Sequence, residues 1–252
     1  MYFVGLDLAW GERRPSGVAT LAADGRLVDI AAAHDDASIA ARLRPYTRGD
    51  CVVAIDAPLI VTNKTGQRMC ETALNRDFRR FDAGAHPANT GKPEFAGIPR
   101  GARIAARLRL DMDPDSREMR RAIEVYPHPA TVALFRLGRT LKYKHKPGRS
   151  FGHLKSELLA LMRLLEGLAG AEVSMRVTDH PEWARLRHHV ETATRKFQLR
   201  AAEDPVDAVV CAYVGLYRER RPEDVTTYGD YQSGYIVTPA PSPFLAPRAR
   251  GR

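Results

Sequence analysis

Short apolar runs separated by turn-forming residues make up the first part of the chain. A near-continuous apolar run over residues 2–8 predicts a strand buried on both faces. Asp24-Gly25 separates two further apolar runs and is typical of a hairpin, because Gly tolerates the positive φ of a type I′ turn. Asp36 can cap a helix that Pro45 would stop. The expected elements are strands at 2–8, 16–23 and 26–32, a helix at 36–43 and a strand at 51–56.

The pattern loosens after residue 60, where a Gly/Pro-rich passage at 82–99 lies between two helical stretches. Such a passage indicates an insertion or lid rather than a separate domain. Farther along, leucines at helical spacing between residues 151 and 168 predict a long helix. The expected elements are helices at 66–81, 102–112, 129–137, 151–168, 181–200 and 205–218, and strands at 121–126 and 235–238.

This order of elements is typical of an α/β protein with a mixed sheet flanked by helices. A chain of 252 residues and 28.0 kDa fits one domain. We therefore predict a single domain over residues 1–252. It would carry an insertion at about 60–118 and a frayed, Pro-rich tail at about 239–252.

Composition indicates an ordinary globular protein, with 44% hydrophobic and 27% charged residues. No apolar run approaches the roughly 20 residues that cross a bilayer. The first apolar stretch contains Asp7 and follows no basic segment, so we predict no signal peptide. Three cysteines without a CxxC spacing are expected to be reduced thiols, which favours a cytoplasmic location without membrane association.

A net charge of +9 and a pI near 9.7 make a nucleic-acid partner an option, because phosphate backbones attract dispersed cations. Only seven lysines are present, so 32 of the 39 basic residues are arginine. A GC-rich genome also produces such a bias, and the charge by itself leaves both explanations open.

Several carboxylates lie where apolar strands or a helix would carry them inward. They are Asp7 after the run 2–6, Asp56 after 52–55, Glu124 within 122–126, and Asp207 at the start of 206–217, with Asp204 just before it. Buried charges are nearly always paired, and a lone carboxylate must protonate or find a cation. Oxygen-only ligands suit Mg²⁺ or Mn²⁺. The pattern therefore indicates a divalent-metal site.

Each acidic residue also has a purely structural explanation. The alternatives are a turn at the strand end for Asp56, pairing with Trp10, Arg13 or backbone amides for Asp7, and a salt bridge to Arg120 or Arg121 for Glu124. For the last helix, Asp204 would be the N-cap, Pro205 the first helical residue, and Asp207 an anion in the first turn. Taken together, the joint structural explanation is weaker than a metal site.

Four short motifs resemble a widespread microbial family of unknown function that is usually described as predicted RNase H-like nucleases. The motifs are Gly5-Leu6-Asp7-Leu8-Ala9-Trp10, Ile55-Asp56-Ala57-Pro58-Leu59, Ile123-Glu124-Val125-Tyr126-Pro127-His128-Pro129 and Asp204-Pro205-Val206-Asp207-Ala208. The last motif is also similar to a helix of Holliday-junction resolvases. Where the family tends toward Asp, this chain has Glu71.

This resemblance implies an RNase H-like five-stranded sheet of order 3-2-1-4-5 and an acidic metal site. It implies Asp7, Asp56 and Asp207 as metal ligands, with Glu124 or Asp204 assisting. We therefore expect a Mg²⁺- or Mn²⁺-dependent nuclease. Its catalytic residues would be Asp7, Asp56, Glu124 and Asp207, and its metal ligands Asp7, Asp56, Asp204 and Asp207. The alternative is a non-catalytic module that keeps the fold and binds nucleic acid or another partner.

Other side chains near these motifs are candidate contacts to a DNA or RNA substrate: Trp10, His128, Lys142, Lys144 and Arg149. The lysines and Arg149 would bind phosphates, and His128 could protonate a leaving group or touch a phosphate. A solvated loop explains the basic residues equally well, a helix start explains His128, and core packing explains Trp10. The sequence leaves the oligomeric state open.

Overall fold

The computed structural model describes residues 1–11 and 14–248. Its centre is a five-stranded sheet in the order β3-β2-β1-β4-β5, which confirms the predicted mixed sheet. β1 pairs with β2 antiparallel and with β4 parallel, while β4 pairs with β5 parallel. The strands are β1 (Tyr2–Asp7), β2 (Ser16–Ala22), β3 (Leu27–Ala33), β4 (Cys51–Ile55) and β5 (Arg120–Glu124).

A second, two-stranded sheet follows the last long helix. It consists of β6 (Val225–Asp230) and β7 (Gly234–Pro239), paired antiparallel. The sequence predicts only β7, which is buried along its length, whereas β6 is polar and mostly exposed and so carries little apolar signal. A bridge between Val125 and Val237 places β7 beside the end of β5.

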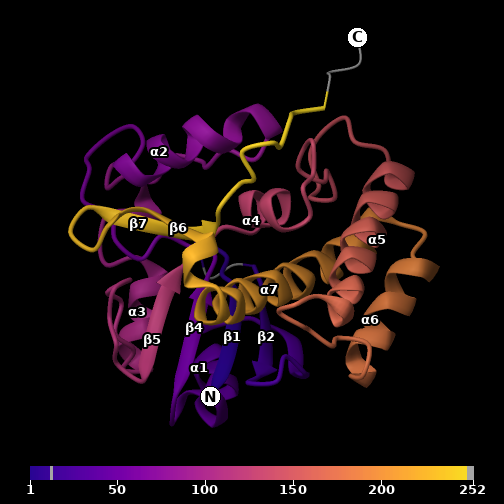
Figure 1. Ribbon diagram of the computed structural model, residues 1–252, viewed down its shortest axis with the longest axis horizontal. Coiled ribbons are helices and arrows are strands. Elements are labelled where there is room, and N and C mark those ends of the chain that lie inside the picture. Colours follow the sequence, from indigo (N-terminus) through magenta and orange to yellow (C-terminus); the bar gives the residue numbers. More distant parts are fainter. Residues whose placement is uncertain (12–13, 249–252) are drawn as a thin grey trace.

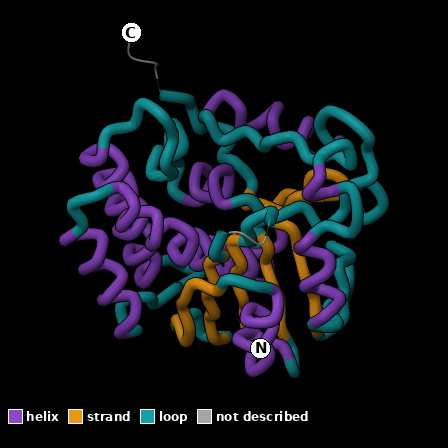
Figure 2. The backbone as a smooth tube through the Cα atoms, turned by 180° about the vertical axis from the view of Figure 1, so that it is seen from behind, coloured by secondary structure: helices purple, strands orange, loops and turns teal. Residues whose placement is uncertain are grey.

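The helices surround the main sheet, and loops gather at one end of it (Figures 1 and 2). The α-helices are α1 (Asp36–Thr47), α2 (Met69–Phe78), α3 (Arg100–Arg107), α4 (Pro127–Leu134), α5 (Phe151–Gly167), α6 (Pro181–Thr192) and α7 (Lys196–Arg220). Short 3₁₀ turns lie at η1 (Arg79–Phe81), η2 (Pro93–Phe95), η3 (Leu168–Gly170) and η4 (Pro222–Asp224). Across the described residues, none of these helices combines the length and apolar character required to cross a membrane.

Several expected helix boundaries are wrong; the helix expected at 181–200, for example, ends at Thr192. The N-cap of α1 is Asp35, whose side chain accepts a hydrogen bond from Ser38 N at 2.7 Å, and the helix continues through Pro45. The last helix begins at Lys196 and also runs through a proline, Pro205. Each proline removes only one backbone hydrogen bond. For the last helix, burial of the segment before Pro205 favours continuation, because residues such as Leu199 pack in the core.

The start of α7 at Lys196 also removes one structural explanation for its acidic residues. Asp204 lies inside the helix, so the alternative explanation of Asp204 as an N-cap is wrong. Asp207 is likewise outside the first turn, where the helix dipole would favour an anion.

Helix α7 crosses β1, β2 and β4 on one face of the sheet (Figure 1). Two glycines permit this close approach. A Cβ on Gly5 would lie 1.8 Å from the carbonyl oxygen of Ala208, and a Cβ on Gly17 would lie 1.9 Å from that of Asp204. Glycine inside a strand often marks such a contact with another backbone segment. The two glycines therefore set the height of α7 above the strands.

A smaller apolar cluster joins the expected insertion to the second sheet. Cys70, Leu74 and Phe78 of α2 pack with Tyr228 of β6 and Ile236 of β7. Together, α2 and the β6–β7 hairpin lie beyond the carboxyl ends of β4 and β5 (Figure 1). This places residues of the insertion next to the carboxylates that end those strands.

Candidate functional site

Neighbouring strands carry two of the predicted carboxylates to the same edge of the sheet. Asp7 is the last residue of β1, and Asp56 follows β4 directly. The strands are parallel, and the backbone N–H of Asp56 donates to the carbonyl of Leu6 at 2.8 Å. Because parallel strands end at the same edge, the two side chains reach the same pocket. The strand order that the family resemblance implies, together with a carboxylate at the end of each strand, predicts this proximity.

Helix α7 supplies two more carboxylates from above the sheet. Gly17 is paired with Asp7 in the β1–β2 register and also contacts the backbone of Asp204. Asp207 lies one helical turn further along and is 1% exposed. The structure thus brings Asp7, Asp56, Asp204 and Asp207 together, although they are separated by up to two hundred residues.

The ammonium group of Lys144 lies at the centre of this cluster. Its Nζ is 2.6 Å from Asp207 Oδ2, 3.0 Å from Asp7 Oδ2 and 3.3 Å from Asp204 Oδ1. The neighbouring Tyr143 hydroxyl donates to the other oxygen of Asp207 at 2.6 Å. Lys144 was expected to contact a substrate phosphate, but here it is the counter-ion of three carboxylates. Its distance from these residues in sequence explains why no local pattern signals the contact.

One ammonium does not offset the negative charge of the cluster. Burial raises the pKa of Asp7 to about 6, with Asp207 adding to the rise and Lys144 opposing it. Burial also raises the pKa of Asp207. For Lys144, burial acts to lower the pKa, but attraction to Asp207 and Asp7 raises it well above the usual range. The site therefore holds its ammonium firmly and still favours additional positive charge.

Asp56 has fewer hydrogen-bond and ion-pair contacts than the other carboxylates of the cluster. Among the described residues its side chain has no hydrogen-bond or ion-pair partner, in contrast to those of Asp7 and Asp207. Burial raises its pKa well above the usual value, and the nearby charge of Asp7 adds to this rise. The expected turn at the strand end therefore does not account for this side chain.

Glu124, at the end of β5, forms an ion pair with Arg68 of the expected insertion. Arg68 Nη2 is 2.6 Å from Glu124 Oε1, and Nη1 is 2.9 Å from Oε2. The Leu59 backbone N–H donates to Oε2 at 2.9 Å. Burial raises the pKa of Glu124, and Arg68 opposes that rise. The partner is thus neither Arg120 nor Arg121, the latter being paired with Glu219 at 3.0 Å.

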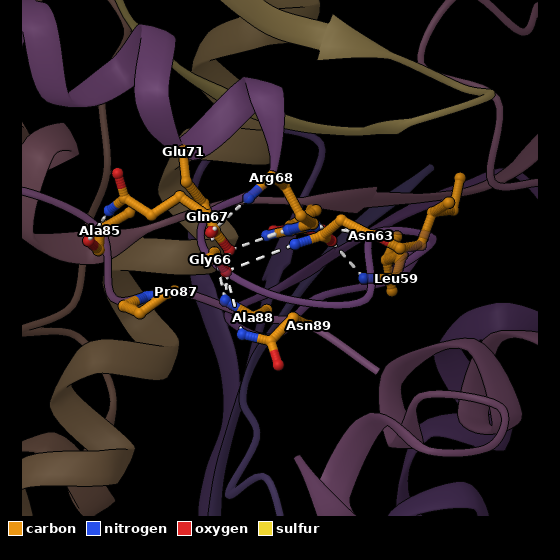
Figure 3. Close-up of polar contacts among 12 residues, drawn as sticks. Leu59, Asn63, Gly66, Gln67, Arg68, Glu71, Ala85, Pro87, Ala88 and Asn89 are labelled. Carbon is orange, nitrogen blue, oxygen red and sulfur yellow. Dashed lines mark hydrogen bonds and ion pairs between the residues drawn. The ribbon is translucent and has the colours of Figure 1, made fainter. Parts of the chain in front are cut away.

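Arg68 also binds Glu71, and this second pair closes a buried network (Figure 3). Arg68 Nε donates to Glu71 Oε1 at 2.9 Å, and the Ala88 backbone N–H donates to both Glu71 oxygens at 3.1 Å. All three charged side chains are buried. Sequence reasoning missed Arg68; its i,i+3 spacing to Glu71 was the available signal.

The remaining expected substrate contacts line the same cavity of about 420 Å³, together with Asp7, Asp56, Glu124 and Asp207. Trp10 packs edge-on against Phe95 at 4.9 Å between ring centroids. His128 Nδ1 lies 3.2 Å from Thr140 Oγ1, and burial together with Lys144 lowers its pKa to about 3. The expected contacts in the cavity wall are Trp10, His128, Lys142, Lys144 and Arg149.

The basic residues beside Lys144 have local partners. Lys142 Nζ is 3.0 Å from Asp82. Arg149 Nη1 donates to the carbonyls of Lys142 and Lys144 at 3.3 and 2.7 Å. Arg13, one of the possible partners of Asp7, lies outside the described residues, as do the last four residues of the expected tail.

The donor chemistry of the cluster fits Mg²⁺ or Mn²⁺, because every donor is a carboxylate oxygen. In residues 1–11 and 14–248, however, no three His, Cys, Asp or Glu side chains are arranged as a ready-made metal site. The ammonium of Lys144 lies where the carboxylates converge. The residues therefore fit a divalent ion once Lys144 has moved.

Comparison with known proteins gave one match. The family described as "Protein of unknown function (DUF429)" matches residues 5–231, which include all the carboxylates discussed above. Searches of curated proteins and of solved structures returned no match.

Proposed function

We propose that this chain, which belongs to the protein family of unknown function DUF429, is a divalent-metal-dependent phosphodiesterase of RNase H-like type that acts on nucleic acid. One observation carries the proposal: carboxylates from β1 and α7 converge on a single cation beside Asp56, which has no partner among the described residues. The sheet order β3-β2-β1-β4-β5, with an acidic helix across it, is compatible with an RNase H-like fold. Fold analogy is a weak argument for activity, so the site must support it.

In this proposal Asp7, Asp204 and Asp207 hold the ion, and Asp56 completes the ligand set from the strand beside Asp7. When bound, Mg²⁺ or Mn²⁺ lowers the pKa of a water and neutralises charge on the scissile phosphate. Both oxygens of Glu124 are already engaged by Arg68, so we assign Glu124 to support of the pocket wall. This differs from the catalytic role expected from its sequence motif.

The other walls of the cavity support a nucleotide substrate. Lys142 and Arg149 line the cavity, and so does Trp10. Cations position phosphates, and an indole ring can stack on a base. A cavity of about 420 Å³ is in the size range of small-molecule pockets, which favours entry of one nucleotide over a whole duplex. A single strand or a strand end is therefore the preferred substrate form.

The proposal is tested by cleavage of labelled single- and double-stranded DNA and RNA in Mn²⁺. Asp7→Asn should reduce metal-stimulated cleavage at least about 100-fold while its circular dichroism spectrum stays unchanged. Asp179→Asn is a matched control, because Asp179 is a half-exposed surface residue paired with Arg176. Cleavage by the Asp7→Asn variant at the wild-type rate would refute the assignment.

A non-catalytic nucleic-acid-binding module is the second candidate, and the position of Lys144 favours it. An internal ammonium neutralises part of the cluster without any metal ion. This candidate predicts nucleic-acid binding that persists in EDTA and no hydrolysis of any substrate in the panel with Mn²⁺. Filter binding and gel analysis on the same samples separate the two functions.

A further inference from the structure

The Lys144 ammonium makes the contacts that a bound metal cation would make in this cluster. An ammonium has three N–H donors, and each of the three carboxylates that it contacts belongs to the proposed metal site. These carboxylates come from β1 and from two successive turns of α7. Lys144 thus joins the same elements that a bound ion would join.

The cluster has more negative charge than this one cation offsets. Asp56 is unpaired among the described residues, and Glu203, one turn before Asp207 on α7, is buried with no hydrogen-bond partner for its Oε1 within residues 1–11 and 14–248. A divalent ion would offset more of this charge than an ammonium does. The two cations cannot occupy one position together, because like charges in close contact repel strongly in a buried site.

The loop that carries Lys144 makes few contacts just after this residue. Residues 145–148 are exposed, and Gly148 adopts a positive φ of 82°. Beyond them, Arg149 donates to the Lys144 carbonyl, and Lys196 Nζ donates to the Arg149 carbonyl at 2.6 Å. Before them, Tyr143 is buried in the core and bonded to Asp207, so it anchors the start of the loop. Segments with little buried apolar surface open at low cost, and residues 145–148 meet this condition.

We propose that Lys144 is a built-in counter-ion that reserves the cation position, and that a divalent ion binds by displacing its ammonium together with residues 145–148, while Tyr143 stays in the core. This inference rests on the proposed function for the identity of the ion. It gives Lys144 a role distinct from phosphate binding, because the residue competes with the metal. It also accounts for the lack of a ready-made metal geometry among the described residues.

The test is a titration of Mn²⁺ into wild type, Lys144→Ala and Lys146→Ala by calorimetry. Lys146 is a charge-matched control, because it is exposed in the same loop. Lys144→Ala should bind Mn²⁺ at least about tenfold more tightly than wild type, whereas Lys146→Ala should change the affinity by less than about threefold. In wild type, Mn²⁺ should also accelerate amide hydrogen exchange over residues 144–148.

The outcomes separate this inference from the proposed function. If Lys144→Ala binds Mn²⁺ no more tightly than Lys146→Ala while wild type binds and cleaves, the displacement is wrong and the function stands. If none of the three proteins binds Mn²⁺, both are wrong. If Lys144→Ala unfolds in EDTA, restoration of its fold by Mn²⁺ supports the inference. Failure of Mn²⁺ to restore it would overturn the inference, since the position would then require the ammonium itself.

Discussion

Arg68 forms a bidentate ion pair with Glu124 across 56 residues of the chain, and neither side chain is more than 4% exposed. The same guanidinium binds Glu71. It therefore joins the expected insertion to the end of β5 and fixes one wall of the cavity. Two carboxylates share one cation in this network, so its stability depends on Arg68 more than on either acid.

Replacement of Arg68 by Met should destabilise the protein by about 3–5 kcal/mol, because Glu71 and Glu124 would remain buried without a cation. Urea denaturation at pH 7.5 measures the change. The double variant Arg68→Met/Glu124→Gln should regain part of this loss, since one unpaired charge is removed.

Arg185→Met is the control for the loss of an arginine. The Arg185 side chain is 70% exposed in its pair with Glu182, and its replacement should change stability by less than about 0.5 kcal/mol. An effect of Arg68→Met as small as that of the control would contradict the role assigned to the buried network.

Gly17→Ala tests how α7 is positioned over the sheet. The new Cβ would lie 1.9 Å from the carbonyl oxygen of Asp204, so the helix must shift. We expect a loss of about 1–3 kcal/mol and weaker Mn²⁺ binding, because the shift separates Asp204 and Asp207 from Asp7. Thermal unfolding and calorimetry measure the two effects.

Gly170→Ala is the matched control, because an added Cβ there meets no other described residue within 4 Å outside its own turn. This variant should keep both the thermal stability and the Mn²⁺ affinity near those of wild type. If Gly17→Ala destabilised the protein but left Mn²⁺ affinity unchanged, the distance of α7 from the strands would not determine metal binding.

The sequence was informative where a carboxylate ends an apolar strand. Asp7 and Asp56 could be placed together because adjacent parallel strands end at one edge. The strand order itself came from the family resemblance. The contacts of Lys144 and Arg68 could not be predicted, because they join residues 137 and 56 positions apart through loops without periodicity. Helix α7 was divided in two because Pro205 outweighed the burial of its first turns, which appears only in the folded chain.

His128 should make stability depend on acid pH. Burial and the nearby Lys144 lower its pKa from 6.5 to about 3 in the folded protein. Between these values the imidazole binds more protons in the unfolded chain, so the contribution of His128 to stability falls as the pH drops below about 6.5, with a slope approaching 1.4 kcal/mol per pH unit. His128→Asn should reduce the difference in unfolding free energy between pH 7.5 and pH 5.

The exposed His188 provides the comparison for this measurement. His188→Asn retains His128 and should keep the wild-type pH difference. If His128→Asn leaves the difference in unfolding free energy between the two pH values unchanged, groups other than His128 determine how stability changes at acid pH.

Asp56→Asn should have opposite effects in the absence and presence of metal. Without metal, it removes a carboxylate that is crowded by Asp7 and Asp207 and has no partner in the described part of the chain, and it should stabilise the protein by about 1 kcal/mol. With Mn²⁺, the variant loses a ligand, so the metal-induced rise in Tm should be smaller than in wild type. Glu124→Gln should instead destabilise the metal-free protein, because it weakens the pair with Arg68. Scanning calorimetry in EDTA and in Mn²⁺ compares wild type with the two variants. If Asp56→Asn is less stable than wild type in EDTA, Asp56 has a structural partner and the prediction is wrong.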